Sequence, residues 1–216
     1  MILHTAPQGS PEWHQARAGC ITGSMFVTAR QRLKSGPSKG DYTTAAKDYA
    51  FRLAIERISG QPLDEGFETW AMKRGHELEP AARAEHEVAI GVLVQPVGFV
   101  TTDDGKFGAS ADGFIGTDGG AEYKCLVSPE RLRSVILSGD LSEFTDQMQG
   151  GMWITGRKWW DFGLYCPALA PIGRQFTHYR MMRDDNYIDA LELDLIAFER
   201  LVSENEAALR NFKEAA

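Results

Sequence analysis

The sequence predicts an α/β fold in which a mixed β-sheet is flanked by helices. Helical periodicity dominates both ends of the chain, whereas short apolar runs between turn residues, typical of strands, occupy much of the middle. Strands on both sides of a helical stretch are typical of a layered α/β domain. The expected helices are 10–19, a short one from residue 25, 44–58, 68–90, 128–139, 144–153 and 185–212, and the expected strands are 92–94 with 97–102, the two arms of a hairpin within 110–125, 158–165 and 176–181.

Length and composition indicate one domain without a membrane segment. The 216 residues, 43% of them hydrophobic, suffice for one substantial core, so we expect a single domain over residues 1–216. No apolar run approaches the ~20 residues that span a bilayer, and the N-terminus lacks signal-peptide features, so we expect a cytoplasmic location. Three cysteines without a C-x-x-C pair indicate neither a disulfide framework nor a zinc site. The net charge of −7 argues against indiscriminate binding to a polyanion, although residues 1–50 carry six basic and three acidic side chains.

The first expected helix and the segment after it contain candidate anion-binding residues. Ser10 and Pro11 are a typical cap and first helical residue, and the helix is expected to end near Gly19. Ser24 is expected to cap the next helix. Because helix N-termini attract anions, Arg17 and Ser24 lying close together would form a phosphate pocket. The alternative is that Ser24 only caps and Arg17 only pairs with an acidic side chain.

Longer helices are expected on both sides of the strand region. The periodic stretch 44–58 is expected to contribute to the core, and 68–90 is expected to be kinked at Pro80 unless a helix begins there. Glu79, just before that point, is either solvated or faces the hairpin. The C-terminal strand and helix, 174–213, are expected to pack on the sheet.

The stretch from Ser110 to Cys125 is predicted to form a β-hairpin, because the turn signal 117–120 separates two short apolar runs. Residues two apart in a strand share a face, which places Glu122 beside Lys124, and the turn folds Asp112 back towards them. Two carboxylates and an ammonium group are therefore expected to converge.

Such a trio suits hydrolysis of a phosphodiester. Carboxylates are the hard oxygen ligands that Mg²⁺ or Mn²⁺ prefers, and the bound metal lowers the pKa of a water molecule and stabilises charge on the phosphate. Lys124 would position or deprotonate the attacking water. The alternative is an exposed hairpin that carries Asp at a turn and a Glu/Lys mixture on its solvent face.

Four separated segments occur in an order that is more specific than any one of them. They are Trp13-His14-x-x-Arg17-x-Gly19-x-Ile21-Thr22-x-Ser24, Gly75-x-x-x-Glu79, Ser110-x-Asp112-Gly113 with Glu122-x-Lys124-Cys125, and Gln147-x-Gln149-x-x-Met152-Trp153. Over residues 10–165 this order resembles the family of phage lambda exonuclease and the YqaJ-type viral recombinases. The resemblance implies a PD-(D/E)xK, or restriction-endonuclease-like, core, with Ala111 where that signature has proline.

The resemblance also implies a function. The implied enzyme is a metal-dependent 5′-to-3′ exodeoxyribonuclease that degrades one strand of linear double-stranded DNA and leaves 3′ single-stranded overhangs for a single-strand annealing protein. It implies Mg²⁺ as cofactor, with Mn²⁺ as a substitute and two ions per active site, and a homotrimeric ring around DNA. The implied setting is the cytoplasm of a bacterial host, with a phage or prophage gene as the source.

Position by position, the resemblance assigns residues to four tasks and leaves one departure. By counting from Lys124, Glu130 stands where the family has a phosphate-binding arginine; a one-residue shift at Pro129 would bring Arg131 to that place, and Arg133 is the other arginine nearby. Two other readings stay open: an endonuclease or repair nuclease of the same superfamily, and a non-catalytic DNA-binding protein. The implied assignments are metal binding by Asp112, Glu122, Glu79 and the main-chain carbonyl of Tyr123; catalysis by these carboxylates with Lys124 and Gln147; 5′-phosphate binding by Arg17, Ser24 and Arg131; and strand separation by Met72.

Overall fold

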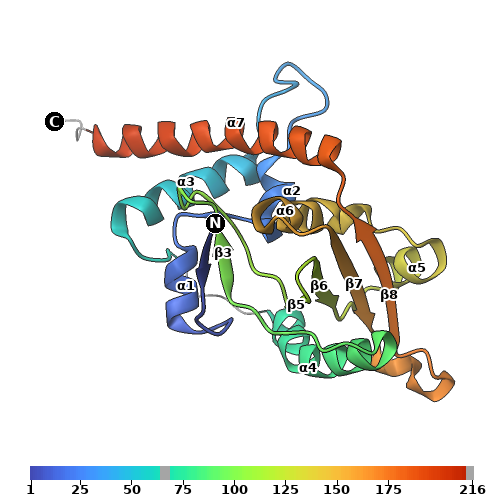
Figure 1. Cartoon of the computed structure of the whole chain (residues 1–216). Helices are drawn as coiled ribbons and strands as arrows, with labels where there is room; N and C mark the ends of the chain where they lie inside the picture. The colour runs from blue at the N-terminus through green and yellow to red at the C-terminus, as the bar shows by residue number, and fades with distance from the viewer. Residues whose placement is uncertain (64–68, 213–216) are drawn as a thin grey trace. The chain divides into compact units, whose positions relative to one another are not determined.

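The computed structural model describes residues 1–63 and 69–212, and the chain divides into two compact units, each built from distant parts of the sequence (Figure 1). The first unit comprises Met1–Glu65, Gly98–Ser110 and Asp184–Ala216, and the second comprises Gly66–Val97 and Ala111–Arg183. The expectation of one nuclease domain over residues 1–216 stays a prediction. Within the described residues, no helix is both long and apolar enough to cross a membrane.

The first unit contains a sheet with the strand order β1-β3-β4-β2. Strand β3 pairs antiparallel with β1 and β4, and β2 runs parallel to β4. The elements are β1 (Ile2–His4), α1 (Pro11–Arg17), β2 (Ile21–Thr22), the 3₁₀ helix η1 (Gly23–Met25), α2 (Phe26–Ala29), α3 (Thr44–Ser59), β3 (Phe99–Thr101), β4 (Phe107–Ala109) and α7 (Asp185–Arg210).

Helices α3 and α7 pack against each other to form the core of this unit, and they lie side by side in Figure 1. Tyr49 of α3 stacks on the buried Phe198 of α7 with 5.5 Å between ring centroids. Arg57 donates two hydrogen bonds, of 3.1 and 2.8 Å, to the carboxylate of Glu199. The C-terminal helix was expected to pack on the sheet. The buried side chains of α7 instead contact α3, because α3 also has an apolar face to cover.

The segment after α1 is fixed to α3 through Gly19. The Gly19 N–H donates to Glu56 Oε2 at 2.8 Å, and Arg57 Nε donates to the Gly19 carbonyl at 2.8 Å. Gly19 has a φ of +73°, and a Cβ there would lie 2.6 Å from Arg57 Cγ, so only glycine fits. The predicted cap at Ser10 is confirmed, but the predicted cap at Ser24 is wrong: Ser24 lies inside η1 and is exposed, and Met25 precedes α2 without a side-chain cap.

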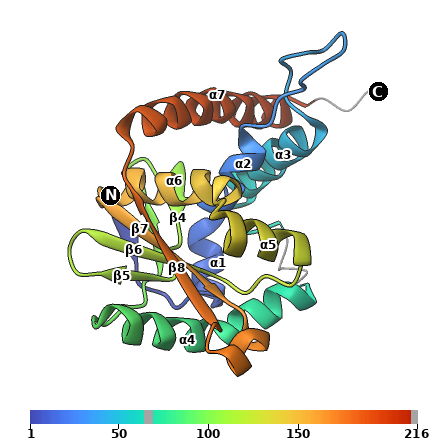
Figure 2. The same cartoon turned by 90° about the vertical axis from the view of Figure 1, so that its right-hand side faces the viewer.

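The second unit contains the predicted hairpin in a mixed sheet of order β5-β6-β7-β8 (Figure 2). β5 pairs antiparallel with β6, β6 runs parallel to β7, and β7 pairs antiparallel with β8. The α/β class with a mixed sheet is therefore confirmed. The elements are α4 (Trp70–Ile90), β5 (Gly113–Ile115), β6 (Gly119–Lys124), α5 (Pro129–Ser138), the 3₁₀ helix η2 (Ser142–Phe144), α6 (Thr145–Thr155), β7 (Trp159–Tyr165), the 3₁₀ helix η3 (Pro167–Ile172) and β8 (Phe176–Met182).

Three expectations for residues 80–102 differ from the structure or had been left open. Residues 97–102 contribute to β3 in the other sheet instead of leading into the hairpin's sheet, because β3 pairs with β1 and β4. Residues 92–94 form no strand, although Gln95 makes an isolated bridge to Phe114. Helix α4 continues through Pro80, so no new helix begins there.

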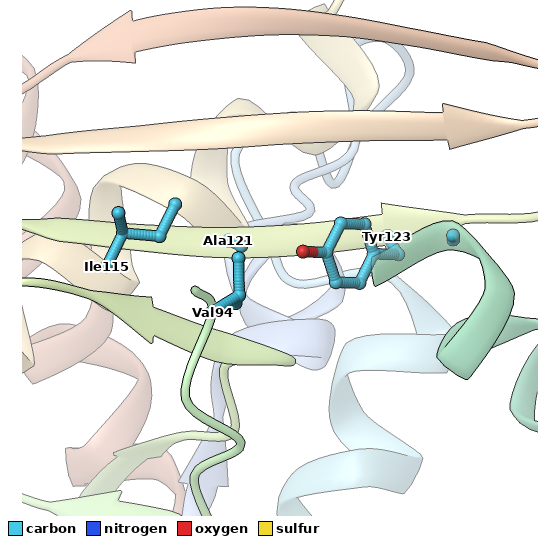
Figure 3. Close-up of a cluster of buried hydrophobic side chains, with 5 residues drawn as sticks. Val94, Ile115, Ala121 and Tyr123 are labelled. Atoms are coloured by element: carbon cyan, nitrogen blue, oxygen red, sulfur yellow. The ribbon is translucent and has the colours of Figure 1, made fainter. Parts of the chain in front are cut away.

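The two faces of β6 have different tasks. Ala121 and Tyr123 point into a hydrophobic cluster with Val94 and Ile115, to which Ala82 of α4 also belongs (Figure 3). Because side chains alternate along a strand, Gly120, Glu122 and Lys124 occupy the opposite face. One face of β6 therefore anchors the strand in the core, and the other presents the polar residues of the site.

Candidate active site

Strand β6 brings Glu122 and Lys124 into direct contact. Lys124 Nζ donates to Glu122 Oε1 at 2.6 Å, and Gln147 Nε2 of α6 donates to the same oxygen at 2.7 Å. Glu122 is only 4% exposed, so these two donors compensate much of the cost of burying its charge. Gln147, assigned from the resemblance, thus faces the carboxylate and does not form part of an ordinary polar helix face.

Asp112 is held at the start of the hairpin by the main chain of β6. Its N–H donates to the Ala121 carbonyl at 3.0 Å, and its Oδ2 accepts from the Tyr123 N–H at 2.5 Å. The predicted fold-back of Asp112 towards Glu122 and Lys124 is therefore present. Hairpin pairing, which depends on local sequence, is enough to produce it.

Excess negative charge gathers around Asp112. Burial, followed by the charges of Glu122 and Glu79, raises the pKa of Asp112 well above its ordinary value, against the opposing effects of Lys124 and the Tyr123 N–H. Burial also raises the pKa of Glu79, and Glu122 adds to this effect, while Arg83 is the largest opposing influence. Glu79 therefore belongs electrostatically to the cluster and is not simply a solvated helical residue.

Lys124 is held as a charged ammonium group. Burial alone would lower the pKa of Lys124, but Glu122 and Asp112 outweigh it, and the pKa rises above its ordinary value. The charge of Arg131 acts in the opposite direction and is the smallest of these influences on the pKa. In this state Lys124 is a hydrogen-bond donor, so the arrangement favours positioning a water molecule over removing its proton.

The carboxylate oxygens of Asp112 and Glu122 are of the chemical type that binds a divalent cation. Within the described residues, Asp112 Oδ1 and Glu122 Oε2 accept no hydrogen bond, whereas the other oxygen of each carboxylate does. Carboxylate oxygens carrying surplus negative charge are the ligands that Mg²⁺ and Mn²⁺ prefer. The described residues contain no ready-made group of three His, Cys, Asp or Glu side chains for a metal, so Glu79 is coupled to the pair through charge and not as a preformed third ligand.

A buried polar chain behind β6 was not predicted from the sequence. The Tyr123 hydroxyl and His86 Nδ1 share a 3.0 Å hydrogen bond, and His86 Nε2 lies 3.2 Å from Asp161 Oδ2 in a close contact without hydrogen-bond alignment. Arg180 donates twice, at 2.8 Å each, to Asp161. Tyr123 separates Glu122 from Lys124 in the sequence, so these hydrogen bonds fix the strand residue between the two side chains of the candidate site.

The candidate phosphate ligands from the N-terminal segment belong to the first unit. Arg17 Nη1 donates to Ser110 Oγ at 2.9 Å, and the guanidinium lies 4.1 Å from the Trp13 ring centroid and 5.3 Å from that of Phe99. Burial lowers the pKa of Arg17. These described partners are neutral, so the alternative in which Arg17 pairs with an acidic side chain is not what is seen within this unit. Ser24 is exposed.

The remaining assigned residues lie on helices of the second unit. Arg131 follows the Ser128 cap of α5 and makes a two-pronged ion pair with Glu143, at 2.9 and 2.7 Å. A phosphate would have to compete with this carboxylate. Met72 is exposed on the first turn of α4, as a strand-separating residue would be. Both roles stay predictions.

Comparisons with known proteins point in one direction. A family model described as a YqaJ-like viral recombinase domain matches residues 12–158. Two solved structures of LHK-Exo, an alkaline exonuclease from Laribacter hongkongensis, share 32% identity over 93% of this chain and 97% of theirs, with TM-scores of 0.78 and, for the complex with dAMP, 0.80. A phage related exonuclease from Haemophilus somnus 129PT shares 17% identity over 88% of this chain and 96% of its own, with a TM-score of 0.67, which shows likeness of fold alone. No protein with a curated description matched.

Proposed function

Because the chain belongs to the YqaJ-like viral recombinase family, we propose that it is a metal-dependent exonuclease that degrades one strand of linear double-stranded DNA from its 5′ end. The PD-(D/E)xK type of fold predicted from the sequence is confirmed by the likeness to LHK-Exo, and these relatives support exodeoxyribonuclease activity. The 5′-to-3′ polarity and the release of 3′ overhangs to a single-strand annealing protein are the finer parts of the proposal. A homotrimeric ring, a phage or prophage origin and the bacterial cytoplasm as location come from the same resemblance.

One observation carries the proposal: a single strand presents Glu122 and Lys124 in contact, and the main chain of that strand holds Asp112. Gln147 adds a second donor to Glu122. An exposed hairpin with unrelated surface charges would leave these groups solvated, but Glu122 is buried and burial raises the pKa of Asp112. Surplus charge of this kind is costly to fold and is typical of functional sites.

The residues divide the chemistry between them. Asp112 and Glu122, with the carbonyl of Tyr123 and support from Glu79, would hold Mg²⁺; when bound, the metal supplies Lewis-acid stabilisation of the phosphate charge and of the attacking water. The ammonium group of Lys124 orients the water for attack on phosphorus. The water oxygen forms a bond to phosphorus, the bond from phosphorus to the 5′ oxygen of the next nucleotide is kept, and the bond to the departing nucleotide's own 3′ oxygen breaks. That 3′ oxygen takes up a proton, and the phosphate stays on the new 5′ end of the strand. The product is a 5′-mononucleotide, the class of molecule to which dAMP belongs.

Polarity requires recognition of the terminal phosphate. We assign this task to Arg17 and Ser24, with Arg131 as the third ligand. Support comes from Arg17, whose described partners are a hydroxyl and two aromatic rings, so its charge is available to an anion. Only a DNA end anchored by its phosphate would present the next phosphodiester to the carboxylates.

Digestion of end-labelled duplexes tests the function. With Mg²⁺, a 5′ label is expected to appear early as a mononucleotide and a 3′ label late, while covalently closed circles remain intact because they have no end. Arg17→Ala is expected to reduce the preference for 5′-phosphate over 5′-hydroxyl ends by roughly tenfold, the scale of one charge-assisted contact. Arg210→Ala, which removes an exposed guanidinium paired with Glu206 on α7, serves as the matched control.

The outcomes separate the alternatives. Early release of the 3′ label would show that digestion runs in the 3′-to-5′ direction, and cutting of circles would identify an endonuclease. An unchanged ratio of phosphorylated to hydroxylated substrates in Arg17→Ala would remove Arg17 from the phosphate pocket. Absence of any metal-dependent digestion would favour the non-catalytic DNA-binding reading.

A further inference from the structure

The first two turns of α4 expose a large aromatic side chain beside two cations. Trp70 is 69% exposed, although tryptophan is usually well covered. It borders a hollow of about 450 Å³ in the second unit. The residues that line this hollow are Trp70, Lys73, Arg74, Glu77, Leu78 and Pro167.

Arg74 links this hollow to the catalytic strand. Its guanidinium lies 6.0 Å from the Trp70 ring centroid, and its Nη1 donates to the carbonyl of Cys125 at 3.2 Å. Cys125 directly follows Lys124 in the sequence. The hollow is therefore tied by a hydrogen bond to the main chain directly after the strand that carries Glu122 and Lys124.

The chemistry of the hollow matches a nucleobase attached to a phosphate backbone. An exposed indole offers a flat face on which any base can stack, and Lys73 and Arg74 supply positive charge for the adjoining phosphates. Leu78 and Pro167 give the hollow apolar lining for the base edge. Glu77 is the one acidic residue among the lining residues, so phosphate is expected on the side of Lys73 and Arg74. A purely apolar protein partner would gain nothing from the two cations.

We propose that Trp70, with Lys73 and Arg74, forms a stacking subsite for an unpaired base of single-stranded DNA next to the catalytic cluster. The proposal deepens the exonuclease function and rests on it for its biological use, but the binding itself needs neither metal nor cleavage. A stacked base would hold the separated strand near the end at which the enzyme works.

The test measures binding of fluorescein-labelled oligothymidylate in EDTA, where cleavage is blocked, and of an oligonucleotide of equal length built from abasic residues. Trp70→Ala is expected to weaken binding of oligothymidylate by roughly tenfold, within the range for one stacked base, and to leave binding of the abasic strand unchanged. Trp70→Phe is expected to restore most of the affinity. Lys73→Ala is expected to weaken both strands alike and to reduce the salt dependence by about one phosphate contact. Val88→Ala, an exposed change on the same helix, is the matched control.

Several results would overturn the proposal. It fails if the wild-type protein does not bind single strands, if Trp70→Ala binds oligothymidylate normally, or if it weakens the abasic strand equally. A change of molar mass in Trp70→Ala or Trp70→Phe would identify the patch as a contact between copies of the chain. Circular dichroism of both variants excludes a folding defect as the cause. Base-dependent binding in a protein without Mg²⁺-dependent digestion would keep the subsite and reject the exonuclease function, so the two failures are distinguishable.

Discussion

The close approach of α6 to the sheet depends on Gly120 and Gly151, and adding a methyl group to Gly120 should be costly. A Cβ on Gly120 would lie 2.4 Å from Trp160 Cε3, and one on Gly151 of α6 would lie 2.9 Å from Trp160 Cη2. The Trp160 ring is 2% exposed, so it has no space into which to move. Gly119 gives the matched control: its Cβ would lie 2.1 Å from Trp159 Cη2, but Trp159 is only partly buried and can swing towards solvent.

The loss of stability in the two variants should therefore depend on how freely the facing tryptophan ring can move, and not on the distance between the added Cβ and that ring. Overpacking costs roughly 1–3 kcal/mol, and replacing glycine by alanine returns roughly 0.4–1 kcal/mol through the unfolded chain. Gly120→Ala should lose roughly 1–2 kcal/mol net, or roughly 2–8 °C in Tm for a chain of this size. Gly119→Ala should stay within about 0.5 kcal/mol of the wild type.

Thermal and urea unfolding of the two variants measure the effect, and nuclease assays well below Tm measure its consequence. Gly120→Ala should also lose activity, because displacement of Trp160 pushes on α6 and so on the Gln147 contact with Glu122. Wild-type stability of Gly120→Ala, or a larger loss in Gly119→Ala, would refute the packing argument.

Two further predictions concern charge. A carboxyl with a raised pKa binds more protons in the folded than in the unfolded protein, so its contribution to the free energy of unfolding falls as pH rises above about 4. Because the pKa of Asp112 is raised, Asp112→Asn without metal should have a higher Tm than the wild type at pH 8, and this gain should vanish near pH 4. Mg²⁺ should stabilise only the wild type. A lower Tm of Asp112→Asn at pH 8 would contradict this. Burial opposes ionisation of Asp161, yet Arg180 and His86 lower its pKa, so its stabilisation is present above about pH 4 and lost as pH falls further. Asp161→Ala should lose about 3 kcal/mol at pH 7, at the low end for a broken buried pair because Arg180 is 46% exposed to water, and a loss that persists unchanged at acid pH would speak against the charge argument.

The parts of the molecule that sequence predicts well depend on local signals. The turn at 117–120 and the spacing of Glu122 and Lys124 predicted the hairpin and its shared face, and the serine caps with proline at the first turn predicted α1 and α5. Pairing of β3 with β1 joins residues about a hundred positions apart, and such register has no local signature. The wrong cap at Ser24 has a related cause, because a tight 3₁₀ turn took the place of a clean helix start.

The buried chain behind the site was beyond sequence reasoning for another reason. His86 belongs to a helix and Asp161 to a strand far along the chain, and neither position carries a motif. Only the fold shows that both are fully buried, with His86 between the Tyr123 hydroxyl and Asp161. Arg74 is a similar case: its position on an ordinary helical face gives no sign of its bond to Cys125. Asp161 is the one charged residue in the apolar run Trp159–Tyr165, which indicates that it needs a partner but does not identify that partner.

The most direct measurement is Mg²⁺-dependent digestion of linear duplex DNA by Lys124→Ala, compared with Lys158→Ala. Lys158 is an exposed lysine of the same unit that pairs with Asp118 near the hairpin turn, so its removal controls for loss of surface charge. Lys124→Ala is expected to fold, to bind DNA and to digest at least a hundredfold more slowly, the scale of a group positioned at the reacting atoms, while Lys158→Ala is expected to digest at the wild-type rate. Wild-type digestion by Lys124→Ala would show that the contact of Lys124 with Glu122 is structural and that the chemistry lies elsewhere.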